Sequence, residues 1–250
     1  MTRALNGARA LVTGGASGIG RAIALALAEE GAVVAIADLA PAASTEAVVA
    51  AISSRGGQAF AVRTDVADET QVLSLFETVQ GRLGGLDILV NNAGILIEKP
   101  LLETTTEDFD RLIGVNLRGA FLVGRQAIRL MTLQGGGRVI NIASELAYLG
   151  RANCSVYCAS KGAILALTRS WAREFAPDIL VNAIAPGPTD TAMLGPESTS
   201  PETLAKEAEI PLGRIGRPEE IAAAAVFLAG PGATFMTGQC VSPNGGAAMF

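Results

Sequence analysis

The sequence predicts an α/β fold in which one parallel sheet is covered by helices on both faces. Short apolar runs alternate with helical stretches along all 250 residues. A glycine-rich turn also joins the first apolar run directly to a helix. Strand–helix alternation of this kind is typical of parallel sheets, because each crossover places a helix on a face of the sheet.

The expected strands are short β-branched or apolar runs, which suit a sheet buried on both faces. In chain order they span Arg9–Thr13, Val33–Asp38, Ala59–Arg63, Leu86–Asn91, Arg138–Ile142, Ile179–Ile184 and Gln239–Val241. We therefore expect a doubly wound sheet of about seven strands.

The expected helices lie between these strands. They span Gly18–Glu30, Ala42–Ser53, Glu69–Arg82, one long helix over Thr106–Leu133, a helix that carries Tyr157 and runs to Phe175, and a last helix that starts at Arg217-Pro218-Glu219-Glu220 and contains the apolar run Ile221–Ala229. Gly31 ends the first helix, and Pro218 stands where the last one starts, which are favoured positions for those residues.

No linker or change in composition divides the chain, so we expect one domain over residues 1–250. The least regular part is Pro186–Pro218, which is rich in Pro, Gly, Ser and Thr. A loop of this length inside a compact domain is often functional, and we expect a substrate lid over roughly residues 186–218. The alternative is a tolerated surface insertion.

Composition excludes several function classes. Half of the residues are apolar and 17% are charged, which is enough to build a substantial core. The net charge of −5 argues against a nucleic-acid partner and against adhesion to an anionic membrane. No apolar run approaches the ~18 residues of a spanning helix, and the N-terminus lacks a signal-peptide stretch. We therefore expect a cytoplasmic protein.

The chain contains no histidine, which excludes a Ser-His-Asp triad and histidine-based zinc hydrolysis. Its three cysteines are Cys154, Cys158 and Cys240. Two thiols at helical spacing, without histidine, make a poor zinc site. We expect reduced, small buried thiols and no metal. Catalysis must then use tyrosine, lysine, carboxylates or cysteine.

Tyr157 and Lys161 are the most informative pair in the chain. Positions four residues apart share one helix face, so the ammonium and the phenol can lie close together. A phenol has a pKa near ~10, and a neighbouring cation lowers that pKa toward a value useful for proton transfer. Ser144 stands upstream of the pair. Taken alone, the pair is equally well explained as an ordinary aromatic residue beside a solvated lysine. The other motifs decide whether the pair is catalytic.

The glycine-rich turn indicates a dinucleotide site. Glycines permit a tight turn and close approach to a pyrophosphate, which the following helix N-terminus stabilises. The turn reads Thr13-Gly14-Gly15-Ala16-Ser17-Gly18-Ile19-Gly20. Asp38, with Leu39 beside it, ends the second strand, where a carboxylate binds ribose hydroxyls and repels a 2′-phosphate. This favours NAD over NADP, although Asp38 alone is also consistent with a turn cap.

Three further strand ends carry candidate cofactor residues, because ligands of open α/β sheets bind outside the carboxyl ends of strands. These residues are Asp65, Val66, Asn92, Ala93, Gly94, Pro186, Gly187 and Thr189. Asp65 either contacts the adenine amino group or caps the next helix. Backbone groups and Thr189 are placed to hold a nicotinamide carboxamide, or Pro186-Gly187 is simply a rigid turn.

These motifs together resemble those of the short-chain dehydrogenase/reductase family, over essentially the whole chain, and especially its 3-oxoacyl reductase-like members. The matching residues are Thr13-Gly14-x-x-x-Gly18-x-Gly20, Asn91-Asn92-Ala93-Gly94, Asn116, Ser144, Tyr157-x-x-x-Lys161 and Pro186-Gly187. The resemblance implies a single Rossmann-type domain and a homotetramer. One departure is Pro243-Asn244-Gly245-Gly246, where the family often has Asp-Gly-Gly, which puts the packing of the C-terminal edge in doubt.

The resemblance also implies roles for four residues. Tyr157 would be the catalytic acid/base, and Ser144 would hydrogen-bond the substrate oxygen. Lys161 would hold the nicotinamide ribose and lower the pKa of Tyr157. Asn116 would anchor a water that relays protons from Lys161. These roles agree with the chemistry of an NAD-linked oxidoreductase. Oxidation of a secondary alcohol requires a base to remove the hydroxyl proton while a hydride is transferred from carbon to the nicotinamide.

The expected substrate is a modest, largely apolar ketone or secondary alcohol. Ser144, Leu146, Tyr157 and Met193 are its expected contacts, in a pocket with few charges near Leu96, Leu149 and Leu194. One alternative is an NADPH-dependent 3-oxoacyl-[acyl-carrier-protein] reductase, with Arg125, Arg129 and Arg173 docking the acidic carrier, although those arginines are equally solvated helix residues. Another is a non-catalytic NAD-binding protein, but such proteins typically lack the tyrosine or the lysine.

Overall fold

The computed structural model describes residues 3–194 and 200–249, and in this part of the chain seven parallel strands form one sheet. The strands are β1 (Arg9–Thr13), β2 (Val33–Asp38), β3 (Gln58–Arg63), β4 (Ile88–Asn91), β5 (Gly137–Ile142), β6 (Ile179–Ile184) and β7 (Cys240–Val241). Their spatial order is β3-β2-β1-β4-β5-β6-β7. The order reverses between β1 and β4, which defines a doubly wound Rossmann-type sheet and confirms the predicted fold.

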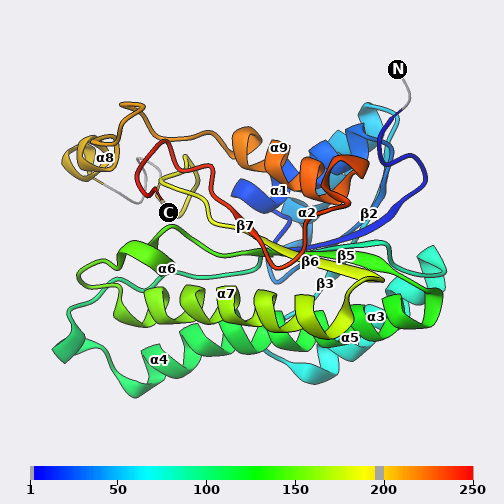
Figure 1. Ribbon diagram of the computed structural model, residues 1–250, viewed down its shortest axis with the longest axis horizontal. Coiled ribbons are helices and arrows are strands. Elements are labelled where there is room, and N and C mark those ends of the chain that lie inside the picture. Colours follow the sequence, from blue (N-terminus) through cyan, green and yellow to red (C-terminus); the bar gives the residue numbers. More distant parts are fainter. Residues whose placement is uncertain (1–2, 195–199, 250) are drawn as a thin grey trace.

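Helices cover both faces of the sheet (Figure 1). They are α1 (Gly18–Glu29), α2 (Ala42–Ser54), α3 (Glu69–Leu83), α4 (Thr106–Ile113), α5 (Ala120–Gln134), α6 (Leu146–Leu149), α7 (Ser155–Phe175), α8 (Pro201–Glu207) and α9 (Pro218–Ala229), with short turns η1 (Leu101–Glu103), η2 (Gly114–Gly119) and η3 (Pro231–Ala233). None of the described helices is both long and apolar enough to cross a bilayer.

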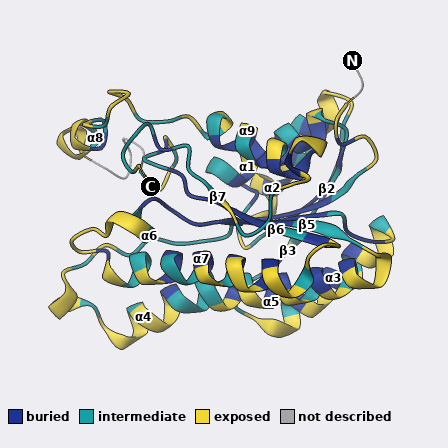
Figure 2. Cartoon of the chain, viewed as in Figure 1, coloured by how far each residue is buried: buried dark blue, intermediate teal, exposed yellow. Residues whose placement is uncertain are grey.

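Alternate strand residues supply two cores, one on each side of the sheet. Val12 packs with α1, α2 and α9, whereas its neighbour Leu11 packs with α3, α5 and α7. Figure 2 shows the strands buried between helices whose outer faces are exposed. Because both faces of the sheet are covered, most strands are continuous apolar runs, and these runs predicted the strands from the sequence.

The predicted single helix over Thr106–Leu133 is wrong in its middle. The helical path is continuous, but η2 (Gly114–Gly119) between α4 and α5 is a π-helical turn. A π turn contains one extra residue, and such turns often occur at functional sites. Here the turn carries Asn116, whose side chain is buried.

Two other differences concern local structure. The fourth strand begins at Ile88 instead of Leu86, and the irregular segment at 186–218 contains a helix, α8. The Ser200 hydroxyl caps α8 by accepting a hydrogen bond from the Thr203 amide, and Pro201 occupies the first turn. Both are ordinary start signals, but the helix is too short for its periodicity to be visible. Residues 195–199 of the expected lid lie outside the described residues.

The C-terminal turn is well organised despite its departure from Asp-Gly-Gly. The Asn244 amide donates to Ser242 Oγ (2.9 Å) and to the Ala248 carbonyl (2.8 Å), while its oxygen accepts from the Gly246 amide (2.9 Å). A carboxylate has no hydrogen to donate to either acceptor. The Asn244 amide therefore bonds to two acceptors that the carboxylate of an aspartate could not serve, and these bonds order the turn at this edge.

Helices α5 and α7 approach closely at one glycine. A Cβ atom on Gly124 would overlap the ring of Trp171, which is a buried member of the core cluster on this side of the sheet. The absence of a side chain at Gly124 thus sets the spacing of α5 from α7, the helix that carries Tyr157 and Lys161.

We expect Gly124→Ala to destabilise the protein by about 1–3 kcal/mol, because one methyl group forces the indole to move. Gly81→Ala is the matched control, since Gly81 is exposed in α3 with open space around it. That change should stabilise by about 0.5–1 kcal/mol through helix propensity. Denaturant unfolding measures both. Equal effects of the two substitutions would contradict the packing argument.

Candidate active site

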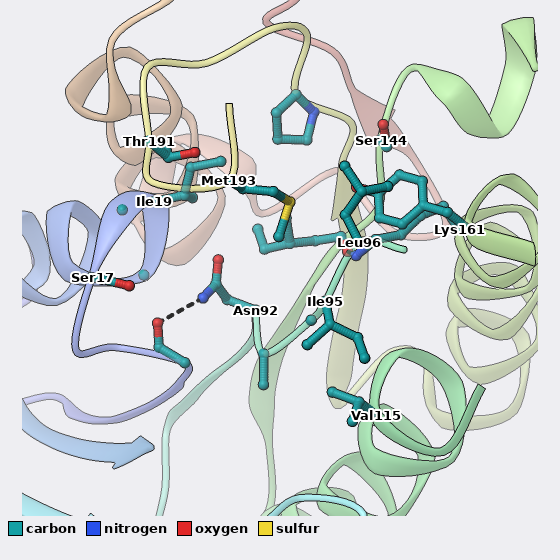
Figure 3. A pocket seen from close by; sticks show the side chains of 18 of the residues that line it. Ser17, Ile19, Asn92, Ile95, Leu96, Val115, Ser144, Lys161, Thr191 and Met193 are labelled. Atoms are coloured by element: carbon teal, nitrogen blue, oxygen red, sulfur yellow. Dashed lines mark hydrogen bonds between the residues drawn. The ribbon is translucent and has the colours of Figure 1, made fainter. Parts of the chain in front are cut away.

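A cavity of about 600 Å³ lies at the carboxyl ends of the strands, where the order reverses between β1 and β4. The predicted cofactor and substrate residues line it. They are Gly14, Ser17, Gly18, Ile19, Gly20, Asp38, Leu39, Asp65, Val66, Asn92, Ala93, Gly94, Ser144, Leu146, Tyr157, Lys161, Pro186, Gly187, Thr189 and Met193. Figure 3 shows side chains from both halves of the sheet facing this space. Two expected residues, Asn116 and Leu149, do not line it.

Hydrogen bonds across the reversal point hold the glycine turn in place. The Asn92 side-chain amide donates to the carbonyls of Thr13 (2.9 Å) and Gly14 (3.0 Å), and Figure 3 draws one of these bonds. In return, Thr13 Oγ1 accepts from the backbone amides of Asn92 and Ala93, each at 3.0 Å. A Cβ atom on Gly20 would overlap the Gly14 carbonyl, so this turn closes only around glycine.

The N-terminus of α1 suits a pyrophosphate. Ser17 is the N-cap residue but its side chain makes no capping bond, and the first turn contains no acidic residue. The first amides of a helix lack intrahelical partners and carry partial positive charge. They therefore face the cavity as anion donors, and the residues present fit a dinucleotide.

Both predicted aspartates line the cavity, and each is held by backbone amides. Asp38 Oδ2 accepts from the Ala16 amide (2.8 Å) and its Oδ1 accepts from the Ala40 amide (2.9 Å). Asp38 thus connects the turn after β2 to the glycine turn, whereas a local turn cap would bond only within its own turn. The helix-capping alternative for Asp65 is wrong, because Asp68 caps α3 and Asp65 instead accepts from the Ala67 amide within its own turn.

Tyr157, Lys161 and Ser144 meet at the other end of the cavity. Lys161 Nζ lies 5.7 Å from the centre of the Tyr157 ring and donates to the Ile142 carbonyl (2.9 Å) at the end of β5. Lys161 is buried, and burial lowers the pKa of its ammonium to about 8. Ser144 stands two residues after the end of β5, and its hydroxyl lies close enough to the phenol to lower the pKa of Tyr157.

The acidity of Tyr157 differs from the expectation. Burial raises the pKa of the phenol well above its ordinary value, and the charge of Glu145 raises it further. The nearby Ser144 hydroxyl acts in the opposite direction but is outweighed. The protein's own groups therefore do not lower the pKa of Tyr157 as the neighbouring Lys161 predicts.

Asn116 is fully engaged with the protein. Its Oδ1 accepts from the Ile95 amide (2.8 Å), and its Nδ2 donates to the Ile95 carbonyl (3.0 Å) and to Ser160 Oγ (3.2 Å). These bonds hold the loop after β4 against α7. The water relay expected of Asn116 stays a prediction.

The cavity is more charged than expected. Glu145, Arg151 and Glu207 line it, and Arg151 forms an ion pair with the buried Glu207 of α8. The expected pocket residue Leu149 is half-exposed and does not line the cavity, whereas Leu96 and Leu194 do. Glu145 could have been suspected from its place next to Ser144. The Arg151–Glu207 pair joins the loop after α6 to the distant helix α8 and leaves no signal in the sequence.

The cysteines form no site within the described residues. Cys154 is buried, Cys158 and Cys240 are partly buried, and all three are free thiols. No group of metal-ligating side chains is found in residues 3–194 and 200–249.

Comparisons with known proteins place the chain in a family. Residues 14–248 match the family model described as enoyl-(acyl carrier protein) reductase. The chain is 43% identical to a cis-4-hydroxycyclohexanecarboxylate dehydrogenase of Sinomonas cyclohexanicum, over 95% of each chain, and 40% identical to a 3-oxoacyl-[acyl-carrier-protein] reductase of Synechocystis sp., over 99% of each. A short-chain type dehydrogenase/reductase structure from Mycobacterium marinum matches with a TM-score of 0.94 and 38% identity, covering 100% of this chain and 98% of that one.

The protein is an oxidoreductase that acts on CH–OH groups. The chain belongs to the short-chain dehydrogenase/reductase family, whose members use nicotinamide cofactors.

The Asn92 bonds to the glycine turn can be tested by cofactor binding. We expect Asn92→Ala to raise the dissociation constant of the dinucleotide about tenfold, because two hydrogen bonds that shape the turn are lost. Isothermal titration calorimetry measures it, with Asn6→Ala at an exposed position far from the cavity as control. Unchanged affinity in Asn92→Ala would show that the turn keeps its shape without these bonds.

Proposed function

We propose that the protein interconverts a secondary alcohol and a ketone by hydride transfer with NAD(H), with Tyr157 as the acid/base. One observation carries this proposal: the phenol of Tyr157, the Ser144 hydroxyl and the Lys161 ammonium meet at one end of a cavity whose other end is a glycine turn suited to a pyrophosphate. A bound nicotinamide would accept or supply the hydride and, when oxidised, add positive charge near the phenol.

The three side chains divide the work of proton transfer. In alcohol oxidation Tyr157 removes the hydroxyl proton, and in ketone reduction it returns one. Ser144 donates a hydrogen bond to the oxygen that becomes negative. The Lys161 cation lies beside the phenol and favours its ionised form, against the effect of burial. Asn116 keeps the loop after β4 in place, and we propose that it also anchors a water on the route from Lys161 to solvent.

Asp38 supports NAD(H) over NADP(H). Its carboxylate is fixed at the cavity by two backbone amides, at the position where a 2′-phosphate would meet its negative charge.

We expect catalytic efficiency to favour NAD(H) over NADP(H) by at least tenfold, and Asp38→Asn to reduce that ratio about tenfold by removing the repulsion. Steady-state kinetics with both cofactors measures the ratio, and Asp110→Asn, elsewhere on the cavity wall, is the control. A preference for NADPH in the unaltered protein would refute the assignment and favour the carrier-protein reductase.

Two relatives define the substrates to test first. Cis-4-hydroxycyclohexanecarboxylate and small cyclic ketones represent the first, and 3-oxoacyl thioesters represent the second. Carrier-protein docking has less support, because Arg125 is paired with Glu69 and stacks over Phe121, its guanidinium carbon 5.4 Å from the ring centre.

The wider organisation is also a proposal. We assign the chain to one domain in which the described parts of segment 186–218 act as a substrate lid, supported by Met193 and Glu207 on the cavity wall.

The exposed side chains of Phe109 and Phe121, on the helices next to Asn116, support a homotetramer. The free thiols support a cytoplasmic location. Light scattering on the purified protein tests the tetramer.

Replacing the phenol tests the mechanism. We expect Tyr157→Phe to lower kcat at least ~100-fold, because the acid/base is removed while the ring remains. Tyr148→Phe changes the chain's other tyrosine and should leave kcat within about threefold. Absorbance of the reduced nicotinamide follows turnover.

The pH dependence has a defined sign. The working base is the ionised phenol, so alcohol oxidation should rise with pH through one apparent ionisation of the coupled Tyr157–Lys161 system. A profile without any rise, or full activity in Tyr157→Phe, would exclude the tyrosine mechanism.

A further inference from the structure

Glu145 is a buried carboxyl group in direct contact with Ser144. Only 7% of Glu145 is exposed, and its Oε2 accepts a hydrogen bond from the Ser144 hydroxyl (3.0 Å). The backbone amide of Glu145 donates to the Pro186 carbonyl (3.1 Å), which fixes the residue between the loops after β5 and β6. Glu145 thus belongs to the cavity wall, although no step of the proposed mechanism uses it.

The bonds of Ser144 leave it in conflict with its proposed role. A serine hydroxyl has one hydrogen to donate and two lone pairs to accept with. The hydrogen is directed at Glu145, and one lone pair is taken by the Leu146 amide (3.1 Å). Ser144 therefore has no hydrogen left for a substrate oxygen while Glu145 is ionised. A neutral Glu145 has a hydrogen of its own, which it can donate to Ser144, freeing the serine hydrogen for the substrate.

The surroundings of Glu145 favour its neutral form more than those of a surface glutamate. Arg151, in the loop between α6 and α7, attracts it, but Arg151 is also paired with Glu207 of α8. Burial outweighs these attractions and raises the pKa of Glu145 above its ordinary value. The other titratable groups that act on the pKa of Tyr157 are the thiols of Cys154, just before α7, and Cys158, on α7, and both raise it.

We propose that Glu145 is a positioning residue whose protonation state decides where Ser144 donates its hydrogen bond. Neutral Glu145 turns the serine hydrogen toward the substrate oxygen and supports ketone reduction. Ionised Glu145 holds that hydrogen and places a negative charge near Tyr157, which opposes formation of the phenolate. This inference rests on the proposed roles of Ser144 and Tyr157.

The sign of each pH effect follows. Ketone reduction should fall as pH rises through the ionisation of Glu145, before Tyr157 itself ionises. In Glu145→Gln the side-chain amide donates to Ser144 at every pH, so this first fall should disappear. The same substitution removes a negative charge that faces Tyr157, so the midpoint for alcohol oxidation should move down by at least about 0.5 pH unit.

The experiment compares pH profiles of kcat and KM, in both directions, for the unaltered protein, Glu145→Gln, Glu145→Asp and Glu46→Gln. Glu46 is exposed on α2 and serves as the control. Glu145→Asp keeps an ionisable carboxyl and should keep the first fall. A second readout needs no turnover. The near-ultraviolet absorbance of tyrosinate is followed against pH in the NAD-loaded protein with the Tyr148→Phe substitution, in which Tyr157 is the remaining tyrosine. Thermal midpoints confirm folding.

The outcomes separate this inference from the proposed function. The role of Glu145 is supported if Glu145→Gln abolishes the fall of ketone reduction at the lower pH and also lowers the midpoint of the tyrosinate titration. In a Ser144→Ala background the glutamine substitution should no longer alter the reduction profile at low pH. Profiles and tyrosinate titrations that superimpose on those of the unaltered protein would overturn the role of Glu145 alone, as would a flat profile in Glu145→Asp. Activity that persists in Tyr157→Phe would instead refute the proposed function.

Discussion

The hydrogen bond from the buried Lys161 ammonium to the Ile142 carbonyl is the interaction on which the site depends most directly. It joins α7 to the end of β5 at 2.9 Å, two residues before Ser144. An ammonium this deeply buried loses most of its hydration, and the backbone carbonyl replaces part of it. The cost of burial appears as the lowered pKa of Lys161. In exchange, the positive charge stays beside the Tyr157 ring and cannot swing into solvent.

A second set of bonds closes the opposite side of the cavity. Two parallel strands run side by side at β1 and β4, and their following loops diverge because the strand order reverses there. Four hydrogen bonds cross this divergence and join Asn92 and Ala93 to Thr13 and Gly14. The loops therefore stay close enough to form one wall, and Ser17 and Gly18 at the start of α1 line the same cavity as the catalytic side chains.

The cavity contains three titratable groups whose pKa values are all shifted by burial. Burial raises the pKa of both Glu145 and Tyr157 and lowers the pKa of Lys161, so all three groups are shifted toward their neutral forms. Such shifts concentrate at sites where proton transfer occurs. The Arg151–Glu207 pair adds a polar link between the loop after α6 and helix α8 without adding net charge.

The sequence alone determined the sheet, most element boundaries and the cofactor-side residues of the cavity, since these depend on local signals. Apolar runs, glycine turns and polar strand ends each reflect the backbone around them, and the i, i+4 spacing of Tyr157 and Lys161 sets one helix face. Only the tertiary structure decided the rest. The π turn at Asn116, the inward direction of Glu145 and the pairing of Arg151 with Glu207 arise from packing between segments far apart in the chain. The sign of the Tyr157 pKa shift was decided in the same way, because burial depends on every element around the phenol and spacing along one helix does not record it.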